Sequence, residues 1–164
     1  MRHAHLPPSP PLPRCAPEVA DRGFYLVLRA DGFVLHMSAG PDDLREMRDR
    51  VYSQVLGSGA SEEIAEAARL LASELVGNAV RWCGSHAPVV VKISGLPREV
   101  VVRVHDPAPD AAPRRRSAAP DNAEHESGRG LWILDALAPG WTVEPTSFGK
   151  QICCRLSKDG VPYA

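Results

Sequence analysis

Two polar residues, Glu74 and Asn78, interrupt a stretch of sequence that otherwise has the pattern of a core helix, ARLLASELVGNAVRW. At about 100° per residue, both side chains project along the edge of an apolar stripe rather than from the opposite, wet face. The stripe is formed by Ile64, Ala68, Leu71, Leu75 and Ala79. Desolvating a carboxylate and an amide without partners costs on the order of several kcal/mol. The pattern therefore predicts that something polar fills the space that they face.

Two motifs further along the chain have residue types that suit a nucleoside triphosphate. Asp106 ends an expected strand in RVHDP, where its carboxylate can accept a hydrogen bond from an exocyclic amine such as that of adenine. Gly128 and Gly130 precede an expected helix that starts near Leu131. The positive end of a helix, approached without side chains, suits phosphate oxygens.

Glu74 and Asn78, on the expected helix over about 61–82, have the residue types for the two remaining tasks, which are metal binding and proton acceptance. Asn78 offers an amide oxygen to Mg²⁺, a cation that prefers oxygen ligands. Glu74, one turn away, can accept a proton from an attacking hydroxyl. Taken singly, a Glu and an Asn at helical spacing, an Asp-Pro turn and a Gly-x-Gly are each more often structural than functional. Their order along one chain is what favours the functional interpretation.

Hydrophobic periodicity predicts the elements that carry these residues. In chain order we expect two strands joined at Ala30-Asp31-Gly32, a helix over 41–57, a helix over about 61–82 capped by Ser61, a hairpin that turns at 95–98, a short helix in GRGLWILDALA, and two last strands in WTVEP and KQICCRL. Consecutive antiparallel hairpins mixed with helices favour an α+β domain, a two-layer α/β sandwich with helices on one face of a mixed, mostly antiparallel sheet.

The domain is expected over residues 23–158, with a leader over 1–22 and a tail over 159–164. The leader contains LPPSPPLP and is predicted to be disordered, either a tolerated tail or a docking peptide. Residues 107–127 show no helix or strand periodicity, and a stretch of this length without structure predicts a mobile lid. The run Arg114 to Arg116 within it is either a solvated charge run or a clamp for an anion.

Composition excludes several function classes. Nineteen basic and twenty acidic residues give a formal charge of -1. The molecule as a whole therefore has no positive electrostatic field that would attract nucleic acid or an anionic membrane surface. No run of about 20 apolar residues is present, so we expect a cytoplasmic protein. The histidines and cysteines have no metal-ligand spacing. Cys15, Cys83, Cys153 and Cys154 are predicted to be reduced thiols that act as small apolar groups.

Three segments together resemble a known family. SELVGNAVRW resembles the N-box, VRVHDP the start of the first glycine box, and ESGRGLWIL the second glycine box of the histidine-kinase-like ATPase superfamily, which is also called the Bergerat or GHKL fold. Within it, the chain is similar to the small anti-sigma-factor serine kinases and their actinobacterial ATP-binding relatives. The resemblance covers roughly residues 33–156.

The resemblance implies a site for ATP and Mg²⁺ under a lid of residues 107–127. It implies Glu74 as the catalytic base, Asn78 as the Mg²⁺ ligand and Asp106 as the adenine reader. At the phosphates and the rest of the nucleotide it implies Gly128, Arg129, Gly130, Leu131 and the GK-pair residue Lys150. The alternative for Lys150 is an exposed lysine at the start of a strand.

Departures from the family pattern affect the neighbourhood of the site. Trp82 stands where relatives often have histidine, Pro107 follows the adenine aspartate without the expected glycine, and Gln151 stands where relatives often have threonine. We expect altered adenine contacts and a stiffer rim. Trp132 and Trp141 are predicted to be packing residues rather than base-stacking platforms.

Three functions follow from the resemblance. The first is a serine/threonine kinase that phosphorylates an anti-sigma-factor antagonist and alternately sequesters a sigma factor. The second is an ATP-responsive binding module without phosphoryl transfer, and the third is a relative that binds a partner and no nucleotide. The family also implies a homodimer, and no direct contact with nucleic acid or membrane is expected.

Overall fold

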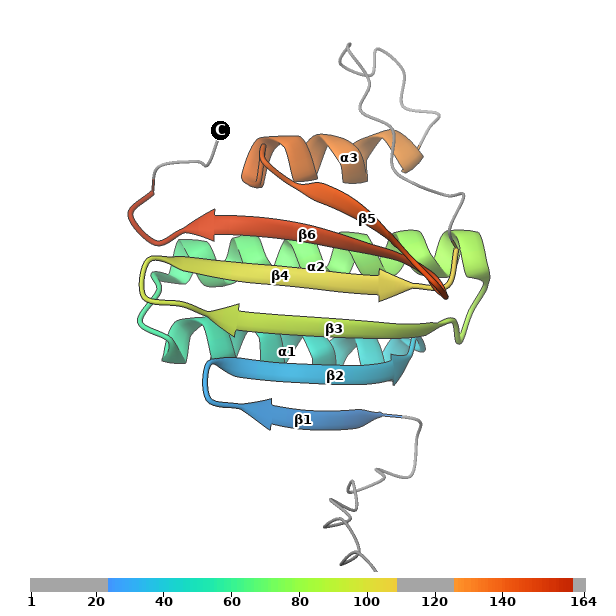
Figure 1. Ribbon diagram of the computed structural model, residues 1–164, viewed down its shortest axis with the longest axis horizontal. Coiled ribbons are helices and arrows are strands. Elements are labelled where there is room, and N and C mark those ends of the chain that lie inside the picture. The colour runs from blue at the N-terminus through green and yellow to red at the C-terminus, as the bar shows by residue number, and fades with distance from the viewer. Residues whose placement is uncertain (1–23, 109–125, 161–164) are drawn as a thin grey trace, which may run out of the picture.

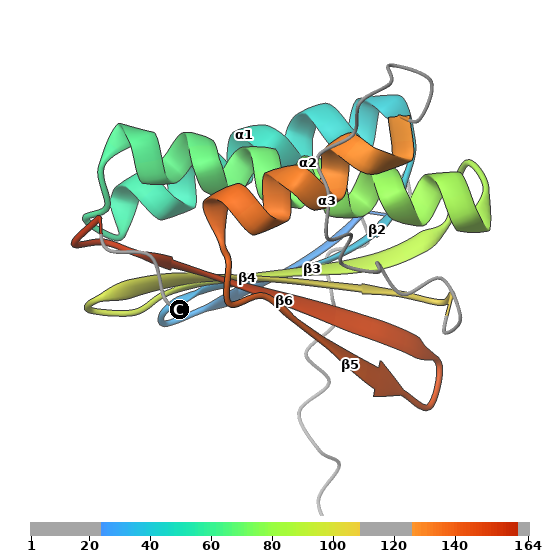
Figure 2. The same ribbon diagram turned by 90° about the horizontal axis from the view of Figure 1, so that it is seen from above.

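The protein is described by a computed structural model over residues 24–108 and 126–160, with the side chains of residues 126–129 outside the description. The elements form two layers, three helices on one face of a six-stranded sheet (Figures 1 and 2). In chain order they are β1 Tyr25–Arg29, β2 Gly32–Ser38, α1 Pro41–Gly57, α2 Glu62–Cys83, β3 Pro88–Gly95, β4 Glu99–Asp106, α3 Glu126–Leu137, β5 Thr142–Thr146 and β6 Gly149–Ser157.

The sheet has the strand order β1-β2-β3-β4-β6-β5, and every pairing in it is antiparallel. The predicted α+β two-layer sandwich is therefore confirmed. The expected mixture of strand directions does not occur among the described strands. The late hairpin β5–β6 inserts β6 next to β4, so that the end of β4 and the start of β6 are paired across a long loop and a helix.

Helix α2 lies at the centre of the helical layer and follows the predicted pattern closely. The Ser61 hydroxyl accepts a hydrogen bond from the backbone N–H of Ile64 at 3.3 Å, as expected of an N-cap. Gly84 ends the helix with a φ of 88°, a conformation that a side chain disfavours. The stripe residues are buried except Ile64, which is half-buried, and Glu74 and Asn78 lie half-buried at its edge.

Helix α1 packs beside α2 through a stripe of its own. The fully buried residues of this stripe are Met47, Val51 and Val55, with Pro41 at the first helical position as predicted. The helical layer and the inner face of the sheet enclose one core that is mainly aliphatic.

Two predictions about the region of α3 were wrong. The helix begins at Glu126 rather than near Leu131, so residues 128–130 lie in its first turns instead of before it. Trp132 is 61% exposed, because α3 turns Leu134 and Ala138 towards the core and therefore directs Trp132 outwards. Trp141 is buried as predicted, and its indole N–H donates to Asp135 at 2.8 Å.

Several predictions fall on residues outside the described ranges: the leader, Cys15, most of the lid and the run Arg114 to Arg116. The three cysteines in the described ranges, Cys83, Cys153 and Cys154, are free thiols, and the last two are buried. Burial raises the pKa of Cys154 to about 12, with the neighbouring Cys153 thiol adding to the effect. None of the described helices is long and apolar enough to cross a bilayer.

Candidate functional site

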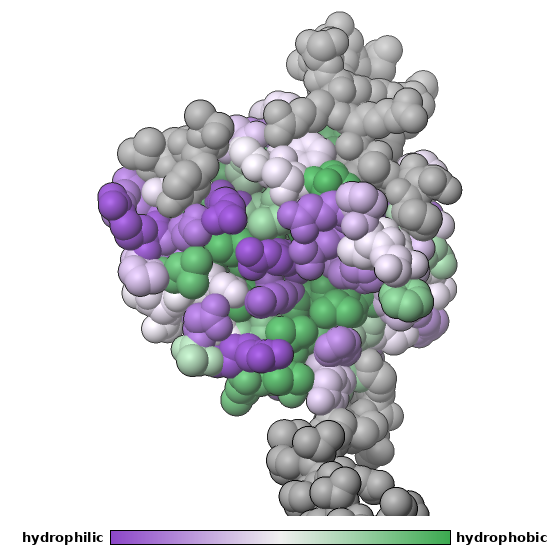
Figure 3. All heavy atoms as spheres, in the orientation of Figure 1, coloured by the Kyte–Doolittle hydropathy of each residue, from purple (hydrophilic) through white to green (hydrophobic). Residues whose placement is uncertain are grey.

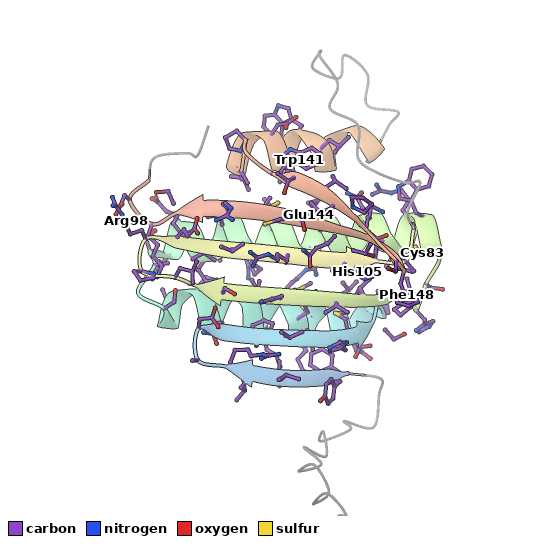
Figure 4. The ribbon with its side chains drawn as sticks, in the orientation of Figure 1. Cys83, Arg98, His105, Trp141, Glu144 and Phe148 are labelled. Carbon is purple, nitrogen blue, oxygen red and sulfur yellow. The ribbon has the colours of Figure 1, made fainter. Side chains whose placement is uncertain are left out.

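The predicted site residues gather at one end of the molecule. The C-terminal end of α2, the end of β4, the start of β6 and the first turns of α3 all lie at this end (Figure 1). Figure 4 shows Cys83, at the last residue of α2, on the same side of the molecule as Phe148, which precedes β6. Antiparallel pairing explains the arrangement, because β4 runs towards this end and β6 starts from it.

Glu74 and Asn78 meet α3 at Gly130. This glycine is buried, and a Cβ added to it would lie 3.1 Å from Glu74 Oε2 and 3.4 Å from Asn78 Nδ2. Both polar side chains of α2 therefore reach the backbone of α3, and the missing side chain at position 130 leaves the room for them. The first two predicted residues and one residue of the predicted glycine turn are thus brought together.

Glu74 and Asn78 differ in their hydrogen-bond partners. No described residue donates a hydrogen bond to the Glu74 carboxylate, although the side chain is half-buried. Asn78 Oδ1 accepts a hydrogen bond of 2.7 Å from Arg81 Nη1, one turn further along the helix. Sequence reasoning missed Arg81, although its i,i+3 spacing from Asn78 is the available signal. The amide oxygen has a second lone pair and can accept another partner.

Asp106 and Lys150 form a buried ion pair. Lys150 Nζ lies 2.7 Å from Asp106 Oδ1, and the two side chains are 4% and 3% exposed. The ammonium also donates to the backbone carbonyl of Ala108 at 2.7 Å, and the N–H of Ala108 donates to the same Asp106 oxygen at 2.9 Å. The alternative of an exposed lysine at a strand start is therefore wrong, because direct pairing of position 106 with position 150 across β4 and β6 turns both side chains inwards.

Gly149 allows β6 to start this close to the end of β4. Its φ is 138°, and an added Cβ would lie 2.0 Å from the Asp106 carbonyl oxygen. Only glycine fits such a close backbone approach at such a φ. The GK pair of the sequence therefore has a structural reason for both of its residues: glycine permits the approach, and lysine neutralises the carboxylate.

The Cys83 thiol, at the end of α2, is sensitive to the charges of the ion pair. Burial raises the pKa of Cys83 above its usual value, the negative charge of Asp106 raises it further, and the positive charge of Lys150 lowers it. These opposing effects place the thiol within electrostatic range of both groups. Asp106 and Lys150 therefore lie close to the last turn of the helix that carries Glu74 and Asn78.

The other residues named from the sequence lie as follows. Gly128 and Arg129 are in the first turn of α3, and Leu131 is half-buried against the core. Trp82 is 63% exposed, one turn beyond Asn78. Gln151 alternates with Lys150 and so lies on the other face of the sheet, where its amide donates to Glu144 at 3.4 Å.

A hollow of about 410 Å³ is also present at this end of the sheet. Its lining includes His36, Ser38, Pro88, Val90, His105 and Phe148, and none of the predicted site residues. His36, Val90 and His105 alternate along their strands with buried core residues, so they face away from the helices. This hollow is therefore separate from the groups around Gly130.

Comparison with known proteins decides the family. The model of the histidine kinase-like ATPase domain matches residues 37–156, which is most of the chain. The chain belongs to this family. It is also similar to an uncharacterized protein of Streptomyces coelicolor, with 38% identity over 72 residues that make up 43% of this chain and 67% of the relative.

A histidine kinase-like ATPase domain implies ATP, typically with Mg²⁺, and the residues present fit these groups. Asn78 would supply an amide oxygen to Mg²⁺, and Glu74 a carboxylate oxygen that can accept a proton. Gly130 carries no side chain where the backbone of α3 meets them. Asp106 would offer a carboxylate to a base edge, but its Oδ1 already accepts hydrogen bonds from Lys150 and from the N–H of Ala108.

The thiol of Cys83 provides a test of this geometry that does not depend on activity. In a Cys15→Ser background, Asp106→Asn removes a negative charge and should lower the pKa of Cys83, so that alkylation at pH 8 becomes faster. Lys150→Met should make it slower. The measurement is the rate of iodoacetamide labelling of Cys83 by mass spectrometry. Glu63→Gln, at the opposite end of α2, is the control, and equal rates in all variants would contradict the proximity.

The buried ion pair should contribute strongly to stability once one partner is removed. Lys150→Met leaves a buried carboxylate uncompensated, and we expect the free energy of unfolding to fall by about 3 kcal/mol or more. Combining it with Asp106→Asn should restore much of the loss, because no charge then remains buried. Urea denaturation of the two single variants and the double variant measures the coupling. Strictly additive losses would argue against a direct pair.

Proposed function

We propose that this protein binds Mg²⁺·ATP at the end of α2 and acts as a serine/threonine protein kinase of the anti-sigma-factor type. Its substrate would be an anti-sigma-factor antagonist in a partner-switching system in the cytoplasm, and its alternative partner a sigma factor. The observation that carries the proposal is the meeting of Glu74 and Asn78 at the side-chain-free position Gly130. The family membership and the resemblance of the three motifs support it.

Each residue has a chemical role in this proposal. Bound ATP with Mg²⁺ supplies the phosphoryl group and the charge that neutralises its oxygens. Glu74 accepts the proton of the substrate hydroxyl, which its lack of a described hydrogen-bond donor leaves it able to do. Asn78 would supply its amide oxygen as a ligand for the cation. Because α3 begins at Glu126, its first-turn N–H groups, up to that of Gly128, are the backbone donors that would remain for phosphate oxygens, and Arg129 would add its guanidinium. Lys150 and Asp106 face the base.

A second candidate is an ATP-responsive binding module that transfers no phosphoryl group. The ion pair favours it, because Asp106 already accepts hydrogen bonds from Lys150 and from the N–H of Ala108. A base that approaches Asp106 must use its other oxygen or displace the lysine. Nucleotide binding would then change the position of Lys150 and of residue 108, where the segment that precedes α3 begins.

Asn78 should determine how binding depends on the metal. For the unchanged protein we expect ATP to bind more tightly with Mg²⁺ than with EDTA. For Asn78→Ala, the ratio of the dissociation constant in EDTA to that in Mg²⁺ should be at least about tenfold smaller than for the unchanged protein, because the amide oxygen is removed while the backbone remains. Isothermal titration with and without Mg²⁺ measures it. Arg81→Ala is the matched control, since it frees the same oxygen and should preserve the metal dependence or enhance it.

Glu74 should separate catalysis from binding. Glu74→Gln retains the shape of the side chain and loses the proton acceptor, so labelling of a serine in the cognate antagonist by labelled ATP should fall by about 100-fold or more. The dissociation constant for ATP should change less than about threefold. The control variant Glu63→Gln, on the same helix, should label the antagonist as strongly as the unchanged protein does. ATP binding with no phosphoprotein from the unchanged protein would favour the binding module, and equal labelling by Glu74→Gln would exclude this base.

A further inference from the structure

The sheet face that points away from the helices, which we name the open face, carries an unusual pair of charges. Lys92 on β3 is the direct cross-strand partner of Arg103 on β4. Both side chains are half-buried, and neither forms an ion pair or hydrogen bond with a described residue. Like charges directly opposite each other destabilise an antiparallel pair. The fold therefore keeps an unfavourable arrangement at the middle of its sheet.

The acidic residues on the open face do not compensate this pair. Glu99 lies further along β4 and is paired with Arg155 at 2.8 Å. Glu144 lies on the edge strand β5 and accepts a hydrogen bond from Gln151. A third cation, Arg29, is exposed near the opposite edge and also has no described acidic partner. The uncompensated charge of the open face is therefore positive.

Apolar side chains surround the charged pair in the same row of the sheet. The row continues from Lys92 to Val34 and Val27 on one side, and from Arg103 to Cys153 on the other. Val90 and Val101 lie in the adjacent rows; Val90 is half-buried, whereas neighbouring side chains already bury Val101. Figure 3 shows this face, with hydrophilic side chains across the middle and hydrophobic ones beside them. No described helix covers it (Figure 2).

We propose that the open face is a docking surface for a protein partner with an acidic patch interleaved with apolar side chains. Lys92 and Arg103 gain their missing counter-ions from the partner, and the half-buried Val27, Val34 and Val90 on the Lys92 side lose water. A second copy fits poorly, because a two-fold, face-to-face dimer would oppose the same cations to each other. Nucleic acid fits poorly too, since three unpaired cations are few and phosphates leave the valines uncovered.

Charge reversal can separate docking from folding. Lys92→Glu places an acidic group opposite Arg103 and should raise the urea midpoint of unfolding, while it should weaken binding of an acidic partner. The probe is a labelled 12-residue peptide of alternating Val and Glu, titrated into the full-length ¹⁵N-labelled protein. We expect salt-sensitive shifts at outward-facing residues of β2, β3 and β4, and an affinity at least tenfold lower for Lys92→Glu.

Matched controls decide between occupants. Arg45→Glu makes the same change of charge on the exposed side of α1 and should leave peptide binding intact. The proposal is overturned if Lys92→Glu binds the peptide as tightly as the unchanged protein, or if a single-stranded oligonucleotide or phosphatidylserine vesicles bind the open face more tightly. It is also overturned if the NMR signals of the open face shift when the protein is diluted without any peptide, because that result would identify a second copy as the occupant. ATP is absent throughout, so the outcome is independent of the proposed kinase activity.

Discussion

The burial of one stripe of α2 against the sheet is the constraint on which the site depends. Leu71, Leu75 and Ala79 are essentially inaccessible to solvent, and burying each leucine stabilises the fold by roughly 1.5–3 kcal/mol. This burial fixes the rotation of the helix about its axis. A rotation by one residue, about 100°, would expose the leucines. Glu74 and Asn78 are therefore held at the edge of the stripe, facing α3, by packing rather than by their own hydrogen bonds.

The ion pair at the end of β4 shows how the fold tolerates a buried carboxylate. Asp106 is neutralised by Lys150 and hydrogen-bonded to the backbone at 108, so no uncompensated charge is left in the core. In the proposed function these bonds oppose a nucleotide base, which would have to share or replace them.

The parts of the fold that depend on local sequence could be predicted, and the parts that depend on distant pairing could not. Ser61 and the stripe of α2 are local signals, and they gave the correct helix. The start of α3 was placed too late because Gly128 and Gly130 suggest a break, at a cost of about 1 kcal/mol each, which packing of the helix against α2 outweighs. The burial of Lys150 depends on a partner 44 residues away, which no local pattern reveals.

Strand β4 connects the two surfaces that carry the proposals. Arg103 and Asp106 are three residues apart, so the alternation of a strand places the first on the open face and the second on the inner face, beside the proposed nucleotide site. The two charges differ in their neighbours. Asp106 forms an ion pair with Lys150, whereas Arg103 lies opposite Lys92 and has no described counter-ion. A partner held at the open face thus contacts the strand whose last residue bonds Lys150.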